Sequence, residues 1–174
     1  MEIELQEQYQ DIISEIRQRI LSAEILSDER ENVVFIESAT LQIRKILELI
    51  AYFSLLLNKG KVNRKIREEY HAKRIINAIS ENTTIFYPFP SRIIPPNSSL
   101  DQPMLIPIGY KHALSQKEFN EVYQDCGKVL HAQHPFKNEL DFKKYKQNNT
   151  ITLRKLKNLL QNHTVGVRHK NNQL

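Results

Sequence analysis

ILELIAYFSLLL, at residues 46–57, is an apolar run in which Glu48 carries the only charge. A helix that is apolar on most sides belongs at the centre of a bundle or at an interface between subunits. The run stops shortly before Gly60, and glycine is common directly after a helix. Upstream, Asp28 is a residue type that caps helix N-termini. We therefore predict a long central helix over about 30–58.

Residues 2–24 and 62–80 place apolar side chains at intervals of three and four, the periodicity of an amphipathic helix. Ser115 and Glu118 form a capping-box pattern that opens another helix. That helix should end before Pro135, because the residue that precedes a proline avoids the α conformation. These elements predict a mainly α protein, a bundle of four to five helices around the long central helix.

The C-terminal part of the chain contains one more predicted helix, near 150–162, with Thr150 as its cap. Residues 164–174 lack this pattern and are interpreted as a tail. A chain of 174 residues fits one domain, so we expect residues 1–163 to form a single helical domain.

Residues 84–111 interrupt the helical pattern with six of the seven prolines. Proline removes a backbone donor and stops helices, so no helix is expected to cross this stretch. Aromatic and isoleucine side chains are frequent in it, which argues against disorder. We predict a Pro-rich, irregular arm that packs over the bundle or onto a partner, with a short edge strand at 104–108.

The net charge of +5 is divided unevenly along the chain. Residues 1–58 carry a net charge of −6, whereas residues 59–174 carry +11. Nucleic acid is a common partner of such a basic surface, because Lys and Arg displace counterions from phosphates. The alternative is that the basic residues solvate helices or pair with the acidic half. Both interpretations stay open at this point.

The N-terminal residues lack the charged-then-apolar order of a signal peptide. No uncharged apolar run approaches the roughly 20 residues that cross a bilayer. The single cysteine can form no internal disulfide. The sequence therefore predicts an intracellular, cytoplasmic protein without a membrane partner. We also expect no cofactor, since four glycines leave little room for a phosphate-binding loop.

The segment 123–136 gathers the cysteine, one glycine and two histidines at a predicted helix end. Cys126 lies on the apolar face of the helix, which favours a buried structural thiol. Gly127 leaves bare backbone one turn before His131, so either another helix packs closely there or a ligand approaches. His131 is interpreted as a helix cap or as an acid–base group, with Lys128 on a phosphate.

A metal site at this helix end is not expected. His131 and His134 are three residues apart, which can bring two imidazoles to one side of a helix. However, a metal site needs three or four ligands, and the motif contains no carboxylate. The prediction is therefore that the chain holds no metal.

A second candidate site lies on the basic helix at 62–80. Arg64, Arg67 and His71 would share one surface, since residues three and four apart are neighbours on a helix. An arginine that binds phosphate beside a histidine that moves a proton can cleave RNA without a metal ion. The alternative is ordinary charge pairing with the glutamates that follow. Further nucleic-acid contacts are predicted at the basic residues Lys61, Lys65, Arg74 and Lys128.

On the central helix, Arg44 and Glu48 lie one turn apart, with Glu37 on the same stripe. Such a pair is more often a buried or half-buried structural ion pair than a catalytic one. We interpret it as structural.

The spacing of Arg64 and His71, with six residues between them, resembles the signature of HEPN proteins, an arginine and a histidine separated by four to six residues. These are small helical domains from bacterial defence and toxin systems, many of them RNases. The family usually has Asn, Asp or His directly after the arginine, where this chain has Lys65. The resemblance covers about 30–80 and extends to 115–133. It implies a helical bundle that dimerises and sets two active sites across the interface.

Together these observations predict an RNA-directed helical protein, with a HEPN-like, metal-independent endoribonuclease of a defence or toxin system as the specific hypothesis. The alternative is a non-catalytic protein–protein interaction module in a defence or regulatory complex. The expected partners are RNA for an enzyme, and a second copy of the chain or another protein. An enzyme should bring its side chains together, within a chain or across a dimer, whereas a module should leave them apart and expose an apolar arm. The proposed catalytic residues are His131, His71, Arg67 and Arg64.

Overall fold

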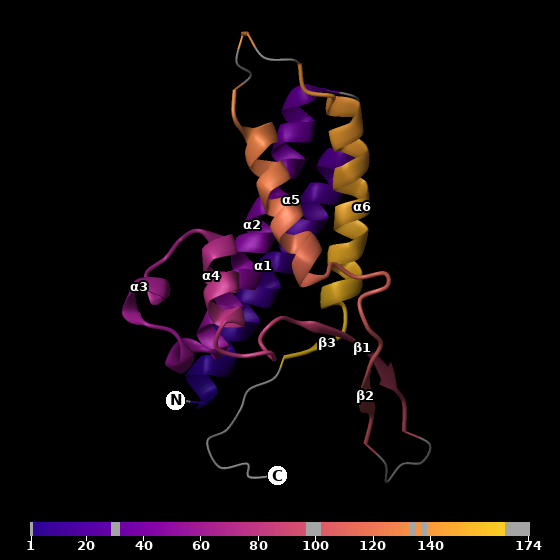
Figure 1. Cartoon of the computed structure of the whole chain (residues 1–174). Helices are drawn as coiled ribbons and strands as arrows, with labels where there is room; N and C mark the ends of the chain where they lie inside the picture. Colours follow the sequence, from indigo (N-terminus) through magenta and orange to yellow (C-terminus); the bar gives the residue numbers. More distant parts are fainter. Residues whose placement is uncertain (1, 29–31, 97–101, 133–134, 137–138, 166–174) are drawn as a thin grey trace.

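The computed structural model describes residues 2–28, 32–96, 102–132, 135–136 and 139–165, and the protein is mainly α (Figure 1). Four long helices lie side by side as a bundle, and two shorter helices and a small sheet adjoin one end of it. The helices are α1 (Glu2–Asp28), α2 (Val33–Leu57), α3 (Arg64–Arg67), α4 (Ala72–Ser80), α5 (Gln116–Leu130) and α6 (Phe142–Leu160), with a 3-10 turn, η1 (Lys59–Lys61). The strands are β1 (Phe89–Ile94), β2 (Met104–Pro107) and β3 (His163–Thr164).

Helix α2 is the central helix, as predicted, because it contacts α1, α4, α5 and α6. Its apolar run supplies much of the core, including the fully buried Leu47, Ile50 and Phe53. On other sides of the helix, Leu49 and Leu55 are partly buried against the same core. Packing within one chain therefore accounts for a helix that is apolar on most of its faces.

The start of α2 differs from the prediction. Asn32, not Asp28, is the N-cap, and its side-chain oxygen accepts a hydrogen bond from the N–H of Val34 at 2.8 Å. Asp28 instead ends α1, which continues four residues beyond its predicted end. Asn and Asp cap helices about equally well, so residue type alone did not separate the two positions.

Helix α6 begins earlier than predicted. The carboxylate of Asp141 caps it by accepting a hydrogen bond from the N–H of Lys144 at 3.0 Å. Thr150, the predicted cap, lies inside the helix and its hydroxyl donates to the carbonyl of Lys146. Asn149 is buried on the same helix and donates to the hydroxyl of Thr40 at 2.9 Å, which ties this part of α6 to α2.

The predicted helix over 62–80 is wrong, because the structure divides it into α3 and α4. Between them the carboxylate of Glu69 accepts hydrogen bonds from the N–H groups of Tyr70 and His71, both at 3.0 Å. These bonds satisfy donors that a continuous helix would use internally. His71 becomes the N-cap residue of α4, so the one-turn relation predicted between Arg67 and His71 is lost.

The Pro-rich arm contains more regular structure than predicted. Strand β2 confirms the predicted edge strand, and β1, which was not predicted, pairs with it antiparallel, with Ile93 opposite Leu105. The sheet order is β2-β1-β3, and Pro90 of β1 pairs with His163 of β3. The predicted tail is therefore wrong at residue 164, which lies in a strand, while residues 166–174 are outside the described part of the chain.

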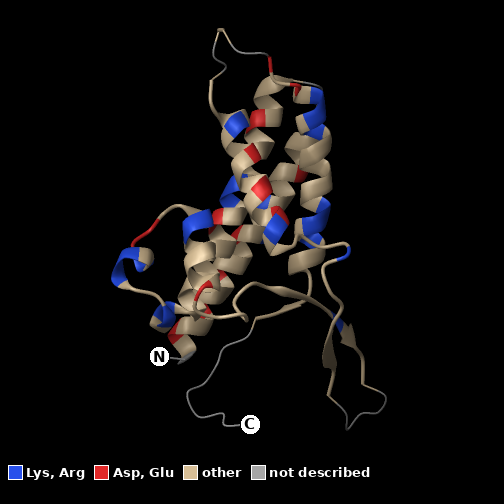
Figure 2. Cartoon of the chain, in the orientation of Figure 1, with Lys and Arg blue, Asp and Glu red and all other residues tan. Residues whose placement is uncertain are grey.

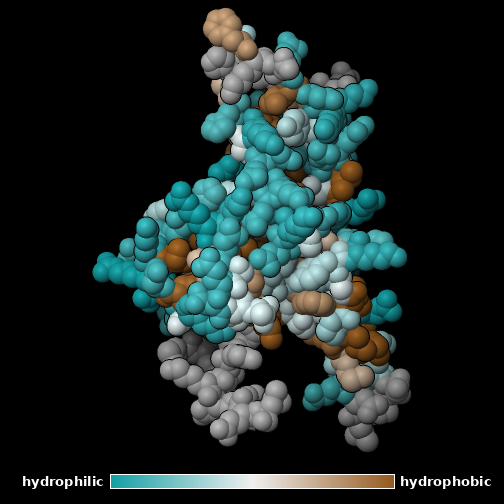
Figure 3. Space-filling view, in the orientation of Figure 1, coloured by the Kyte–Doolittle hydropathy of each residue, from teal (hydrophilic) through white to brown (hydrophobic). Residues whose placement is uncertain are grey.

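The arm is anchored at its base and exposed at its far end. Phe86 and Tyr87 are buried in the core, and the hydroxyl of Tyr87 donates to the carbonyl of Leu114. Beyond this anchor, apolar side chains of the β1–β2 hairpin are exposed, and Figure 3 shows them gathered over the two strands. None of the helices in the described ranges combines the length and the apolar character needed to span a bilayer.

Candidate functional site

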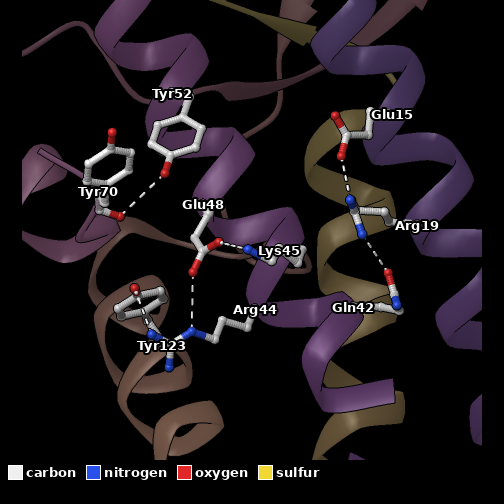
Figure 4. Close-up of polar contacts among 9 residues, drawn as sticks. All are labelled: Glu15, Arg19, Gln42, Arg44, Lys45, Glu48, Tyr52, Tyr70 and Tyr123. Atoms are coloured by element: carbon white, nitrogen blue, oxygen red, sulfur yellow. Dashed lines mark hydrogen bonds and ion pairs between the residues drawn. The ribbon is translucent and has the colours of Figure 1, made fainter. Parts of the chain in front are cut away.

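The most concentrated group of polar side chains near a predicted site residue joins three helices. Arg44 and Glu48 come from α2, Tyr123 from the middle of α5, and His71 from the N-cap of α4. Figure 4 shows the first three on one side of α2, and His71 contacts the ring of Tyr123. We call these four residues the Arg44 cluster.

Arg44 is held by contacts on two elements. Its Nε donates to Glu48 Oε1 at 3.2 Å, and its Nη2 donates to the hydroxyl of Tyr123 at 3.2 Å. The guanidinium carbon also lies 4.7 Å from the centroid of the Tyr123 ring, within cation–π range. The predicted ion pair with Glu48 is confirmed and is half-buried. The side chain of Arg44 retains 29% of its exposure, so a ligand can reach it.

Gly127 lies one turn after Tyr123 on α5, directly beside this arginine. A Cβ built at Gly127 would meet Arg44 Nη1 at 3.5 Å, an ordinary contact distance. The group that approaches the bare backbone is therefore the arginine side chain of α2. Because the bonds to Glu48 and Tyr123 use Nε and Nη2, the Nη1 amino group faces this open stretch of α5.

His71 lies against Tyr123, the residue that also contacts Arg44. Its ring packs edge-to-face on Tyr123, with centroids 5.2 Å apart and an interplanar angle of 74°. The residue is exposed, and its backbone N–H is fixed by Glu69. Hydrogen bonds from the His71 backbone and from the Arg74 side chain lower the pKa of Glu69, so this carboxylate is ionised at neutral pH. Tyr123 thus contacts both a guanidinium and an exposed imidazole.

Tyrosines border the cluster. The hydroxyl of Tyr52 donates to the backbone carbonyl of Tyr70 at 3.4 Å (Figure 4). The pKa of Tyr52 is raised, first by its partial burial and then by the nearby charge of Glu48. Lys45 donates to the second oxygen of Glu48 at 2.8 Å, so that one carboxylate is shared by two cations. The group therefore retains positive charge for an anionic ligand.

Cys126 forms part of the buried floor beneath Arg44. It is a free thiol, buried in the core, and burial raises its pKa to about 12. A thiol with so high a pKa is not a nucleophile at neutral pH. The prediction of a buried structural cysteine is confirmed.

The other predicted site residues do not join the Arg44 cluster within one chain. His131 is the exposed C-cap residue of α5, eight residues after Tyr123, or about 12 Å along the helix axis. Lys128 is exposed and pairs with Asp125 at 2.7 Å. His134 lies outside the described residues. The segment 123–136 is therefore divided, because Gly127 lies at the Arg44 cluster and His131 lies beyond it.

The basic residues before His71 lie on the surface. The side chain of Arg64 is 84% exposed and pairs with Glu68 at 2.8 Å, as the alternative of ordinary charge pairing predicted. Lys65 and Arg67 are also exposed on α3. Two more predicted residues have partners: Lys61 donates to Asn58 and Thr83, and Arg74 donates to Glu69. These residues form a basic surface next to His71, and none of the contacts described for Arg44 is with them.

Sequence reasoning missed the part that Arg44 and Tyr123 play in this arrangement. The one-turn spacing of Arg44 and Glu48 revealed their ion pair, but Tyr123 lies 79 residues from Arg44. Only the packing of α5 on α2 brings the two together.

Comparisons with models of protein families, with curated proteins and with solved structures found no match to this chain. Over the described ranges, no group of three or more His, Cys, Asp or Glu side chains is arranged to hold a metal ion.

Proposed function

We propose that the protein cleaves RNA without a metal ion, at the Arg44 cluster. One observation carries this proposal: the guanidinium of Arg44 and the imidazole of His71 lie against the same tyrosine, Tyr123. Cleavage of a phosphodiester is accelerated by a cation that stabilises the charge of the transition state and by a group that moves a proton. The two groups come from different elements, α2 and the N-cap of α4, and both contact Tyr123.

The proposed reaction is a transfer within the RNA strand. His71 in its neutral form takes the proton from a ribose 2′-hydroxyl, whose oxygen attacks the adjacent phosphorus atom. The bond from phosphorus to the 5′ oxygen of the next nucleotide breaks, and that oxygen receives the proton from His71. Arg44 binds the phosphate oxygens, on which negative charge develops. Tyr123 is a positioning residue, since it is buried and contacts both groups.

The charge around the site supports an RNA substrate. Residues 59–74, which lead to and follow His71, contain seven Lys or Arg and two Glu, a net charge of +5. Figure 2 shows Lys and Arg positions, in blue, along the ribbon at α3 and near the start of α4. A basic surface of this kind draws a polyanion to the site. The HEPN resemblance implies the same kind of activity, but its signature arginine is Arg64, so it supports His71 and not Arg44.

The test is cleavage of a mixture of total RNA and tRNA by the pure protein in EDTA. His71→Ala should lower the rate by a factor of about 10² or more, as expected for the loss of a general acid–base group. His131→Ala is the matched control and should retain the activity, because His131 is an exposed residue outside the cluster. Absence of cleavage by the pure wild-type protein would contradict the proposal, and so would equal activity of both variants.

A second candidate function is that of a protein–protein interaction module, supported by the exposed hairpin. Met104, Leu105 and Ile108 are all exposed, and they project from a sheet that is joined to the bundle at its base. Contiguous exposed apolar side chains are typical of interaction surfaces. Under this alternative, Leu105→Lys should shift the mass measured by light scattering towards the monomer or abolish capture of a partner, without changing RNA cleavage.

A further inference from the structure

Tyr70, next to His71, is exposed to an unusual degree for an aromatic residue. It is 82% exposed, although the next residue, His71, packs against Tyr123 of α5. The residue belongs to neither α3 nor α4 and lies in the connection between them. A large ring that gains nothing from burial is a candidate for contact with a ligand.

The backbone around Tyr70 is held firmly. Its N–H and the N–H of His71 both donate to Glu69 Oε1, and its carbonyl accepts a hydrogen bond from the hydroxyl of Tyr52. Glu69 is itself held by Arg74 at 3.3 Å. Four bonds therefore hold a segment that has no helix or strand of its own. They fix the point from which the ring extends, and this reduces the entropy lost when a ligand packs on it.

The surroundings of the ring define the chemistry of that ligand. Tyr70 lies inside the basic segment 59–74, which attracts phosphates, and directly precedes His71. An exposed aromatic ring in a basic groove or surface is a typical platform for an unpaired nucleobase, because every base has a flat face that can stack. In a duplex these faces are already covered by neighbouring bases. An exposed aromatic ring inside a basic segment therefore favours a single-stranded nucleic acid over a duplex as the ligand.

We propose that Tyr70 stacks on an unpaired base of the RNA, and that the substrate of the Arg44 cluster is single-stranded RNA. The proposal rests on the function proposed above, and it adds the substrate class and the residue that selects it. A base on Tyr70 belongs to a nucleotide that lies near His71, since Tyr70 and His71 are consecutive residues. Stacking thus brings the scissile bond to the site.

The first test is binding of a fluorescent single-stranded 2′-O-methyl RNA in EDTA, followed by fluorescence anisotropy. This RNA keeps the bases and phosphates but lacks the attacking hydroxyl, so binding is measured without cleavage. Tyr70→Ala should weaken binding at least tenfold, whereas Tyr70→Phe, which keeps the ring, should stay within about twofold of wild type. Phe136→Ala is the matched control, because Phe136 is an aromatic residue with 92% exposure outside the basic segment. A duplex of the same sequence should bind Tyr70→Ala and wild type equally.

The outcomes separate this inference from the proposed function. If Tyr70→Ala binds the single strand as wild type does, or weakens single strand and duplex equally, the inference is wrong even where His71→Ala abolishes cleavage. If the binding pattern is as expected and ordinary RNA is not cleaved, the inference stands as a binding site and the proposed reaction is wrong. If the wild type binds no RNA, both are wrong, and a protein partner becomes the occupant to seek at Tyr70.

Discussion

Arg44 and Arg64 are both arginines with a glutamate one turn later, yet the molecule holds them in opposite ways. Arg44 is bonded to Glu48 and also to Tyr123, across the contact of α2 with α5. Arg64 is the first residue of α3, a helix of only four residues, and is bonded to Glu68, its C-cap. Their side-chain exposures are 29% and 84%. Sequence spacing gives the two pairs the same description, while tertiary packing makes only one of them rigid.

The difference matters for function because ordering a long side chain costs entropy. An exposed arginine loses rotamer freedom when it binds a phosphate, which offsets part of the binding free energy. Arg44 has already lost that freedom in the folded protein, through contacts that leave Nη1 open. A preorganised cation stabilises developing charge without further reorganisation. Under the proposed function, the comparison favours Arg44 as the residue that binds the phosphate, with Arg64 and its neighbours attracting the polyanion.

The largest expected effect is on catalysis, where each arginine is replaced by lysine. Arg44→Lys keeps the charge but loses the planar fork that contacts Glu48, Tyr123 and phosphate, so kcat/KM for a single-stranded RNA should fall by a factor of about 10². Arg64→Lys should stay within a factor of about three. The measurement is steady-state cleavage in EDTA, with circular dichroism to show that both variants keep their helices. Equal losses in the two variants would remove the distinction between a catalytic and a steering arginine.

Much of the fold could be predicted from local patterns. The capping box at Ser115 and Glu118 is present, with Glu118 N–H donating to the serine hydroxyl and Ser115 N–H donating to the Glu118 carboxylate. The central helix could be predicted from its apolar run, since a helix that is apolar on most sides belongs at the centre of a bundle or at an interface between subunits. These features depend on residues within one or two turns of each other, which a sequence displays directly.

The candidate site could be predicted only in part. His71 was identified from its spacing to Arg64, although the helix assumed for that spacing is interrupted by the side chain of Glu69. A glutamate is ordinarily a good helix former, and its role as an acceptor for two backbone donors depends on local geometry that periodicity does not show. The contact of His71 with Tyr123 likewise depends on how α4 and α5 pack. Long-range contacts of this kind leave no pattern in a single sequence.

The next effect is on stability. Arg44→Ala removes two hydrogen bonds and a cation–π contact from a half-buried position, so the free energy of unfolding should fall by about 2–3 kcal/mol. Arg64→Ala removes one exposed ion pair, for which a loss below about 0.5 kcal/mol is expected. Urea unfolding followed by circular dichroism measures both. A small loss for Arg44→Ala would mean that the side chain is not fixed in solution and would weaken the argument from preorganisation.

The smallest effect concerns Gly127, which leaves the space beside Arg44 open. Glycine inside a helix costs about 0.5–1 kcal/mol relative to alanine, and a Cβ at this position meets Arg44 Nη1 only at 3.5 Å. Gly127→Ala should therefore stabilise the protein by about 0.5–1 kcal/mol in urea unfolding. Under the proposed function it should also lower RNA cleavage several-fold, because the added methyl group lies against Nη1 of the arginine proposed to bind the phosphate.

Gly60→Ala provides the control for that last effect, because a Cβ at Gly60 meets nothing within 4 Å. Gly60 belongs to η1 and not to α5. It should leave cleavage unchanged. A loss of stability in Gly127→Ala would show that α2 and α5 pack more closely than this arrangement allows. A gain in stability with unchanged cleavage would place the substrate on another side of Arg44. Only the combination of higher stability and lower activity connects the missing side chain to access to the arginine. A glycine needed only for close helix packing would instead lose stability on replacement.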